Sequence, residues 1–154
     1  MPNHLVAFTL DGQRYALRLA SVLQVTRMVE VAPLPKAPKV VLGVLNLHGR
    51  IIPVLSLRRR FGAEDKEVRL DDQLLIADTG RRRVALVVDS VTGVLERSSY
   101  EITNAEQMMP GVEHVEGLAK LEEGILFIHN LDRFLLPEEE GELQALLTQP
   151  QGAE

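Results

Sequence analysis

The chain has 154 residues, a length typical of one domain with its own hydrophobic core. It contains no cysteine, which excludes disulfides, thiol nucleophiles and thiolate metal sites and is compatible with a cytoplasmic location. Its 17 basic and 22 acidic residues give a net charge of −5, and aromatic residues make up 4%, so nucleic-acid binding is disfavoured. The sequence has neither a signal peptide nor a long apolar span, so we expect no membrane insertion.

Short apolar or alternating runs separated by turn residues predict a protein made mainly of β-strands. In the first half, Asp11-Gly12 and His48-Gly49 are expected hairpin turns, and the proline-rich stretch 31–38 is an extended connector before one helical turn at 57–61. The strands expected there are 5–10, 14–19, 22–28, 43–47 and 50–55.

In the second half, a long polar loop is expected at 98–113. The strands expected there are 74–77, 83–88, 94–97, 114–121 and 125–129. The acidic tail 137–154 can form a short helix, with glutamates suited to its start. We favour a frayed, solvated terminus for this tail.

The two halves of the chain resemble each other. With a shift of 69 residues, five of the ten positions in the window 16–25 are identical to those in 85–94. With a shift of 74, a second set of residues coincides: Gly43, Leu47, Ile51, Leu57 and Arg59 fall on Gly117, Leu121, Ile125, Leu131 and Arg133. An internal duplication therefore predicts one domain over residues 1–136, made of sub-barrels at about 5–61 and 74–135 with a groove at their seam.

No catalytic motif with a known mechanical basis occurs in the sequence, neither a phosphate-binding glycine loop nor a nucleophile elbow nor a zinc-binding helix. We therefore expect no enzymatic activity, no metal and no cofactor. The basic triplets 58–60 and 81–83 are expected to be solvated turn charge rather than contacts to a phosphate or an acidic partner. The apolar runs 40–47 and 87–91 are either core or the lining of a docking groove, and the residues alone leave both alternatives open.

The segment GVLNLHGRIIPVLSLRRRFG at 43–62 resembles the G-V-x-N-L-R-G-x-[VI]-x-P-[VI]-x-D-L-R-x-x-F segment of the CheW-like family of chemotaxis coupling proteins. The segments 8–25, 86–96 and 115–135 are similar to this family in order and spacing. The resemblance implies two packed five-stranded SH3-like β-barrels. It also implies a non-enzymatic adaptor that couples the cytoplasmic hairpin tips of chemoreceptors to the regulatory domain of a CheA-type histidine kinase.

By matching motif positions, the resemblance implies a receptor- or partner-binding set, whose members are Val22, Gln24, Gly43, Asn46, His48, Gly49, Val94 and Gly117. The glycines would allow the close approach of a docking helix. Three positions depart from the family pattern: His48 replaces an arginine, Ser56 an aspartate and Gln24 a glutamate. The alternative function, from another class, is a small-molecule-binding β-barrel protein that uses the groove between the barrels.

Overall fold

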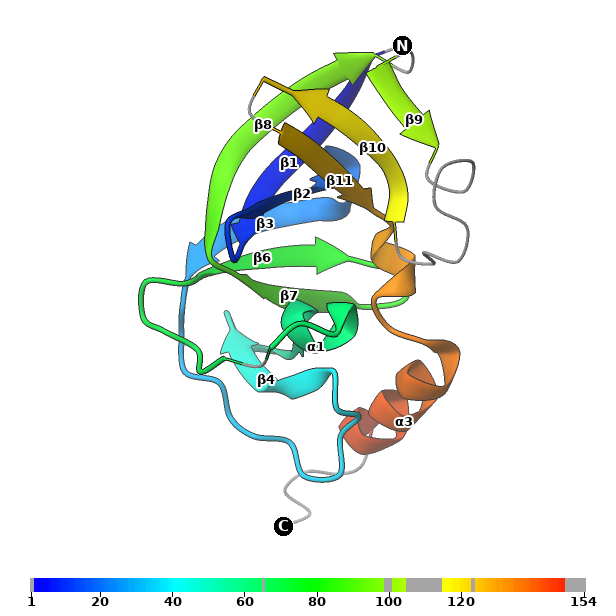
Figure 1. Cartoon of the computed structure of the whole chain (residues 1–154). Coiled ribbons are helices and arrows are strands. Elements are labelled where there is room, and N and C mark those ends of the chain that lie inside the picture. The colour runs from blue at the N-terminus through cyan, green and yellow to red at the C-terminus, as the bar shows by residue number, and fades with distance from the viewer. Residues whose placement is uncertain (1, 65, 99–100, 105–114, 123, 149–154) are drawn as a thin grey trace.

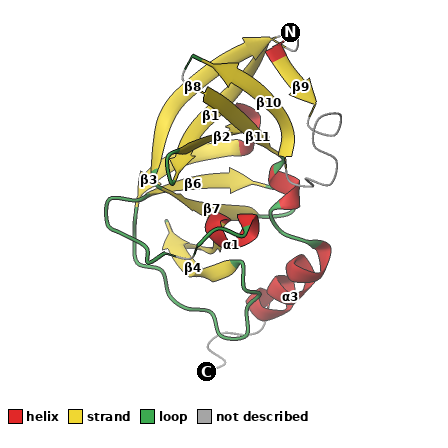
Figure 2. Cartoon of the chain, viewed as in Figure 1, coloured by secondary structure: helices red, strands yellow, loops and turns green. Residues whose placement is uncertain are grey.

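The computed structural model describes residues 2–64, 66–98, 101–104, 115–122 and 124–148, which form two curved β-sheets stacked on each other (Figures 1 and 2). The six-stranded sheet has the order β8 (Ser90–Ser98), β1 (Pro2–Leu10), β2 (Gln13–Arg18), β11 (Gly124–His129), β10 (Val115–Leu121) and β9 (Ile102–Asn104). The five-stranded sheet has the order β3 (Val22–Arg27), β6 (Gln73–Asp78), β7 (Arg83–Val88), β5 (Arg50–Ser56) and β4 (Val41–Leu47). The mainly β prediction is confirmed.

Helical segments are few and short. They are the 3-10 turns η1 (Leu19–Ser21) and η3 (Leu131–Arg133) and the helices α1 (Leu57–Phe61) and α3 (Pro137–Thr148). The helical turn predicted at 57–61 is confirmed by α1. The loop predicted at 98–113 contains the short strand β9, and its residues 99–100 and 105–113 lie outside the described residues, as does His114.

Both hairpin turns predicted from sequence form as expected. Asp11 and Gly12 have φ angles of 51° and 80°, and His48 and Gly49 have φ angles of 53° and 84°. Positive φ at both central residues is the geometry of a two-residue type I′ turn, whose twist matches that of the flanking strands. These turns join β1 to β2 and β4 to β5, and they set the register of each pair.

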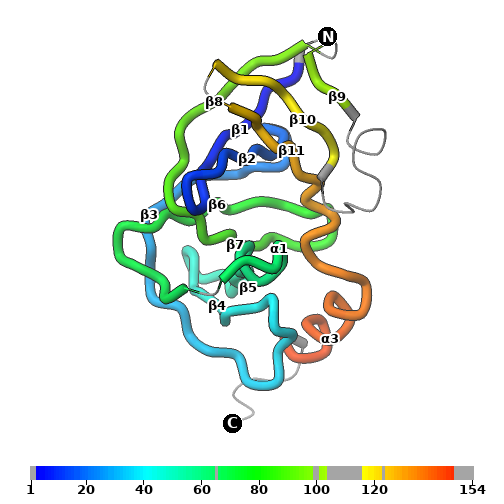
Figure 3. The backbone as a smooth tube through the Cα atoms, in the orientation of Figure 1, coloured from blue at the N-terminus to red at the C-terminus, as the bar shows by residue number. Residues whose placement is uncertain are grey.

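The internal duplication is visible in the order of the strands (Figure 3). A shift of 69 residues carries β1, β2 and β3 onto β6, β7 and β8, and a shift of 74 carries β4 and β5 onto β10 and β11. Under these shifts the order β3-β6-β7-β5-β4 becomes β8-β1-β2-β11-β10, which is the order of the other sheet up to its sixth strand, β9. The registers also agree, since the pair Ala85–Val54 corresponds to Ala16–Ile128.

The division into sub-barrels at 5–61 and 74–135 is wrong about which strands share a sheet. The hairpin β1–β2 lies in the sheet of the second half, and the hairpin β6–β7 lies in that of the first half. The exchange depends on two parallel pairings, of β2 with β11 and of β5 with β7. An apolar pattern locates a strand but does not name its distant partner, so the sequence could not show this exchange.

The core has three parts because alternate residues of the central strands face opposite sides. On β1, Leu5 and Ala7 point into the core of the six-stranded sheet, while Val6 and Phe8 point into a core between the two sheets. Strand β6 is also buried on both faces. Its Leu74 lies in the core of the five-stranded sheet and its Leu75 in the core between the sheets, and both are fully buried. Strands buried on both faces explain the continuous apolar runs of the sequence.

The acidic tail is a docked helix over its described part, so the frayed terminus is wrong for residues 137–148. Helix α3 buries Leu143 completely within the core between the sheets. Glu139 pairs with Arg60 of α1, and Glu140 pairs with Arg82 of the β6–β7 turn. These arginines lie 79 and 58 residues away in sequence, which is why the tail alone did not predict its docking. Residues 149–154 lie outside the described residues.

Candidate partner-docking surface

The seam between the sheets is mainly a closed apolar core rather than an open groove. Of the residues that sequence left as core or groove lining, Val40, Val41, Leu45 and Val88 are at most 6% exposed. Val91 is half-buried and packs against the core between the sheets. The core alternative therefore holds for most of this set.

Five of the exposed large apolar side chains in the described part of the chain lie on the edge strands β3 and β8 and on the β4–β5 and β10–β11 hairpins, and two pairs among them are related by the duplication. Val25 on β3 and Val94 on β8 are 40% and 57% exposed. Ile51 on β5 and Ile125 on β11 are 53% and 49% exposed. The sequence comparison had aligned both pairs, but identity between the halves did not reveal that these residues face solvent. Leu23, 47% exposed beside Val25, was missed altogether.

Strand β3 carries two residues of the implied partner-binding set. Val22 is half-buried, because it starts β3 beside the core between the sheets and packs against that core. Gln24 is exposed two residues later. A bulge separates them, since Val22 pairs with Ala77 and Gln24 with the adjacent Ile76. The same bulge recurs in the β8–β1 pairing, so it is part of the duplicated design.

Three further residues of the set build the β4–β5 turn. The Asn46 side-chain oxygen accepts a hydrogen bond from the Gly49 N–H at 2.8 Å. His48 occupies the first turn position with its imidazole exposed. Within the described residues no hydrogen bond joins Gln24 to His48. The turn therefore presents an imidazole and the exposed Ile51 at one end of the five-stranded sheet.

Two of the three glycines of the set, Gly43 and Gly117, are buried, and their close backbone contacts are made within the chain itself. Ala32 exchanges two backbone hydrogen bonds with Val44, both of 2.8 Å, and a side chain on Gly43 would overlap the Ala32 carbonyl. Gly117 lies against β9 in the same way, where an added Cβ would lie 3.1 Å from the Thr103 carbonyl oxygen. The approach expected of a docking helix is thus made by the segments that cover β4 and β10.

Ser56, which replaces the aspartate of the family pattern, keeps the role of helix N-cap. Its hydroxyl oxygen accepts a hydrogen bond from the Arg59 N–H at 3.2 Å and caps α1. Asn130, its counterpart under the shift of 74, accepts from the Asp132 N–H at 3.0 Å and caps η3. Serine, asparagine and aspartate are comparable N-caps, so replacing the family's aspartate by serine maintains the helix start.

A charge network connects the two sheets on one side of the molecule. The Arg58 guanidinium hydrogen-bonds to Asp11 of the β1–β2 turn and, at 2.9 Å, to Asp89 after β7. The Asp11 N–H also donates to Asp89 at 2.8 Å. The hydrogen bond from Arg58 holds the pKa of the Asp11 carboxyl below its ordinary value. Several triplet arginines thus form ion pairs within the chain, instead of the solvated charge expected.

No described group of three or more His, Cys, Asp or Glu side chains is arranged to hold a metal ion. Among the described helices, none has the length and apolar character needed to cross a bilayer. The described cavities include two of about 300 and 350 Å³, the larger lying between the β6–β7 turn, η3 and the start of α3.

Comparison with known proteins gives one consistent family. The model of the CheW-like domain matches residues 4–138, so α3 lies almost wholly beyond the match. The chemotaxis protein CheW of Rhizobium meliloti is 28% identical over 142 residues, covering 91% of each chain. That of Thermotoga maritima is 28% identical over 132 residues, covering 84% of this chain and 85% of its own.

A solved structure agrees with the sequence relatives. The crystal structure of the scaffolding protein TtCheW from Thermoanaerobacter tengcongensis is 28% identical, with a TM-score of 0.78. The similarity covers 88% of this chain and 99% of that one. The duplicated strands, the shared motif and these similarities lead to one conclusion: this chain belongs to the CheW-like domain family.

Proposed function

We propose that this protein is a non-enzymatic, cytoplasmic adaptor that couples the cytoplasmic hairpin tips of chemoreceptors to the regulatory domain of a CheA-type histidine kinase. The observation that carries the proposal is the similarity, over almost the whole chain, to chemotaxis proteins and to a scaffolding protein of this family. An adaptor needs docking surfaces instead of a catalytic centre. The exposed apolar side chains on β3, β8 and the two hairpins supply such surfaces.

Within this function, the implied partner-binding residues divide by their placement. Gln24, His48 and Val94 are exposed and are proposed to touch a partner directly. Val22 is half-buried and contributes one edge of its side chain. Four other members act indirectly: Asn46 and Gly49 shape the turn that carries His48, and Gly43 and Gly117 seat the covering segments.

Val94 offers the sharpest test, because its side chain is 57% exposed and a polar replacement can be solvated in the free protein. In Val94→Asp, docking would strip water from a carboxylate without giving it a partner, at a cost of about 1–3 kcal/mol, or roughly 5- to 150-fold in affinity. Leu70→Asp is the matched control, since Leu70 is 95% exposed in the loop between α1 and β6.

The measurement is co-sedimentation with membranes that carry chemoreceptors and kinase. We expect Val94→Asp to lose co-sedimentation and Leu70→Asp to retain it, with both variants unfolding in urea close to the wild type. Normal co-sedimentation of a folded Val94→Asp protein would remove β8 from the receptor surface. If neither receptor nor kinase retains the wild-type protein, the proposed function itself is wrong.

A further inference from the structure

Helix α3 occupies a seat built from the rest of the chain. Its Glu139 pairs with Arg60, whose Nε also donates to the Phe134 carbonyl at 3.0 Å. Its Glu140 receives hydrogen bonds of 2.7–2.9 Å from Arg82. All four of these charged side chains are at most 19% exposed. Together with the fully buried Leu143, these contacts define the α3 seat: a site for two adjacent carboxylates and an apolar residue three positions later.

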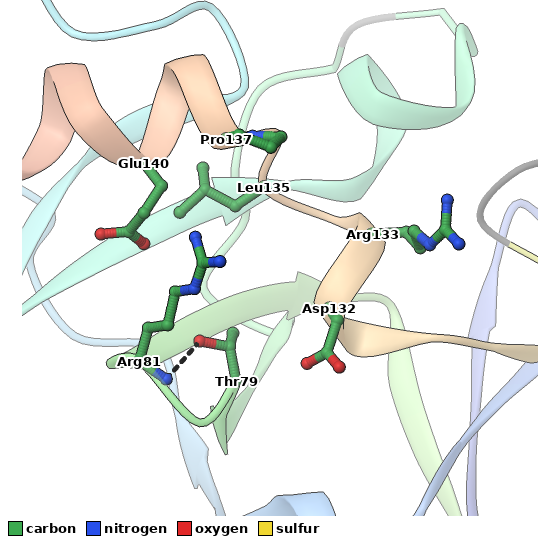
Figure 4. A pocket seen from close by; sticks show the side chains of 7 residues that line it. All are labelled: Thr79, Arg81, Asp132, Arg133, Leu135, Pro137 and Glu140. Atoms are coloured by element: carbon green, nitrogen blue, oxygen red, sulfur yellow. Dashed lines mark hydrogen bonds between the residues drawn. The ribbon is translucent and has the colours of Figure 1, made fainter.

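The α3 seat carries more arginines than form ion pairs with the carboxylates of α3. Arg81 and Arg133 line the cavity of about 350 Å³ at the first turn of the helix, together with Pro137 and Glu140. Figure 4 shows the Arg81 side chain reaching toward Glu140, while the Arg133 side chain extends from η3 away from both of them, at the edge of the cavity that it lines. Within the described residues, neither of these two guanidinium groups has a hydrogen bond or ion pair. The single unpaired carboxylate of the lining, Asp132, does not balance them.

Comparison of the two duplicated halves shows that an ion pair present in one half is missing at this cavity. In the other half, Arg58 of α1 closes onto Asp11 of the β1–β2 turn. Under the same shifts Gly80 replaces Asp11 and Asp132 replaces Arg58, so the β6–β7 turn and η3 have no such pair between them. The opening that remains is the cavity beside α3, with its two unpaired arginines.

We propose that the α3 seat is a second docking site, which takes an acidic amphipathic helix of a partner in place of α3. The partner helix carries the same paired carboxylates and apolar anchor as α3, and additional carboxylates at its N-terminal end. Those additional groups reach Arg81 and Arg133 and form charge-assisted hydrogen bonds that α3 does not make. This difference in contacts is what allows the partner to displace α3, because a competitor with no differential affinity would shift nothing.

Binding of dye-labelled peptides to the full chain tests the proposal by fluorescence anisotropy. One peptide reproduces residues 137–148, and a second carries three extra glutamates before Pro137. The receiving proteins are the wild type and Glu139→Lys/Glu140→Lys, whose own α3 is repelled from the seat. Because α3 occupies the wild-type seat, we expect the first peptide to bind the variant at least about tenfold more tightly than the wild type.

The second peptide examines the two unused arginines. It should bind the wild type more tightly than the first peptide, and hydrogen exchange should show that the amides of α3 lose protection as it binds. Arg81→Gln/Arg133→Gln should abolish this gain. The matched control Arg27→Gln/Arg50→Gln, which removes two exposed arginines of the five-stranded sheet, should keep it.

Two outcomes would overturn the proposal. The first is equal affinity of the wild type for the two peptides, and the second is binding that leaves the protection of α3 unchanged. The exchange measurement on the wild type decides the question even if the lysine variant does not fold.

Discussion

Gly43 is the position where a single added methyl group has the most definite consequence. Its Cβ would lie 2.9 Å from the Ala32 carbonyl carbon and closer still to the oxygen, so the segment that covers β4 would have to move. That movement breaks the two backbone hydrogen bonds between Ala32 and Val44. Their loss corresponds to about 1–3 kcal/mol, of which the higher strand preference of alanine returns about 0.5–1 kcal/mol.

Taking the middle of each range, the expected net destabilisation of Gly43→Ala is about 1 kcal/mol, which for a chain of this length lowers Tm by about 2–4 °C. Urea unfolding followed by circular dichroism gives the free energy directly. The m-value should remain that of the wild type, because the change affects one covering segment and not the compactness of the unfolded chain.

Gly117→Ala is the matched control within the same molecule, since Gly117 corresponds to Gly43 in the duplication. Its nearest obstacle is the Ile102 Cγ2 methyl at 2.8 Å, a side-chain atom that moves with χ1 of a β-branched residue, and the Thr103 carbonyl oxygen lies at 3.1 Å. Shifting Ile102 off its preferred rotamer costs about 0.5–1.5 kcal/mol, which the strand preference of alanine offsets by about 0.5–1 kcal/mol, so we expect a net loss below about 1 kcal/mol. The reasoning is refuted if Gly43→Ala is as stable as the wild type, or if Gly117→Ala is the more damaging change.

Substitutions at three other positions test local parts of the structure. The pKa of Asp11 is lowered by Arg58, so its contribution to stability is present above the ordinary pKa of about 3.9 and is lost as pH falls through the lower folded value. Asp11→Asn should therefore flatten the acid limb of urea stability against pH, and an unchanged limb would contradict this. Ser56→Ala should destabilise the protein by about 0.5–2 kcal/mol through loss of the α1 cap, with Ser56→Asp close to the wild type in the same urea assay. Leu143→Ala should destabilise α3 by about 2–5 kcal/mol, seen as faster amide exchange confined to that helix; unchanged exchange would show that Leu143 does not anchor it.

The sequence by itself determined the local structure. The type I′ turns at Asp11-Gly12 and His48-Gly49, the strand at 83–88 and the helical turn at 57–61 depend on residues that are neighbours in the chain, so their pattern is sufficient. The internal duplication could also be found from the sequence, because it consists of identical residues at a constant spacing. The motif at 43–62 gave the family for the same reason.

The tertiary structure decided everything that depends on which distant segments meet. The exchange of the β1–β2 and β6–β7 hairpins, the closed seam and the docking of α3 all depend on pairings across many tens of residues. The roles of individual residues followed from these pairings. Gly43 faces the chain's own Ala32, and Arg82 meets a carboxylate of the tail. The alternation of apolar and polar residues along a strand is the same whichever strand it pairs with, because the backbone hydrogen bonds between strands do not depend on residue type. Only side-chain packing in three dimensions selects the partner strand.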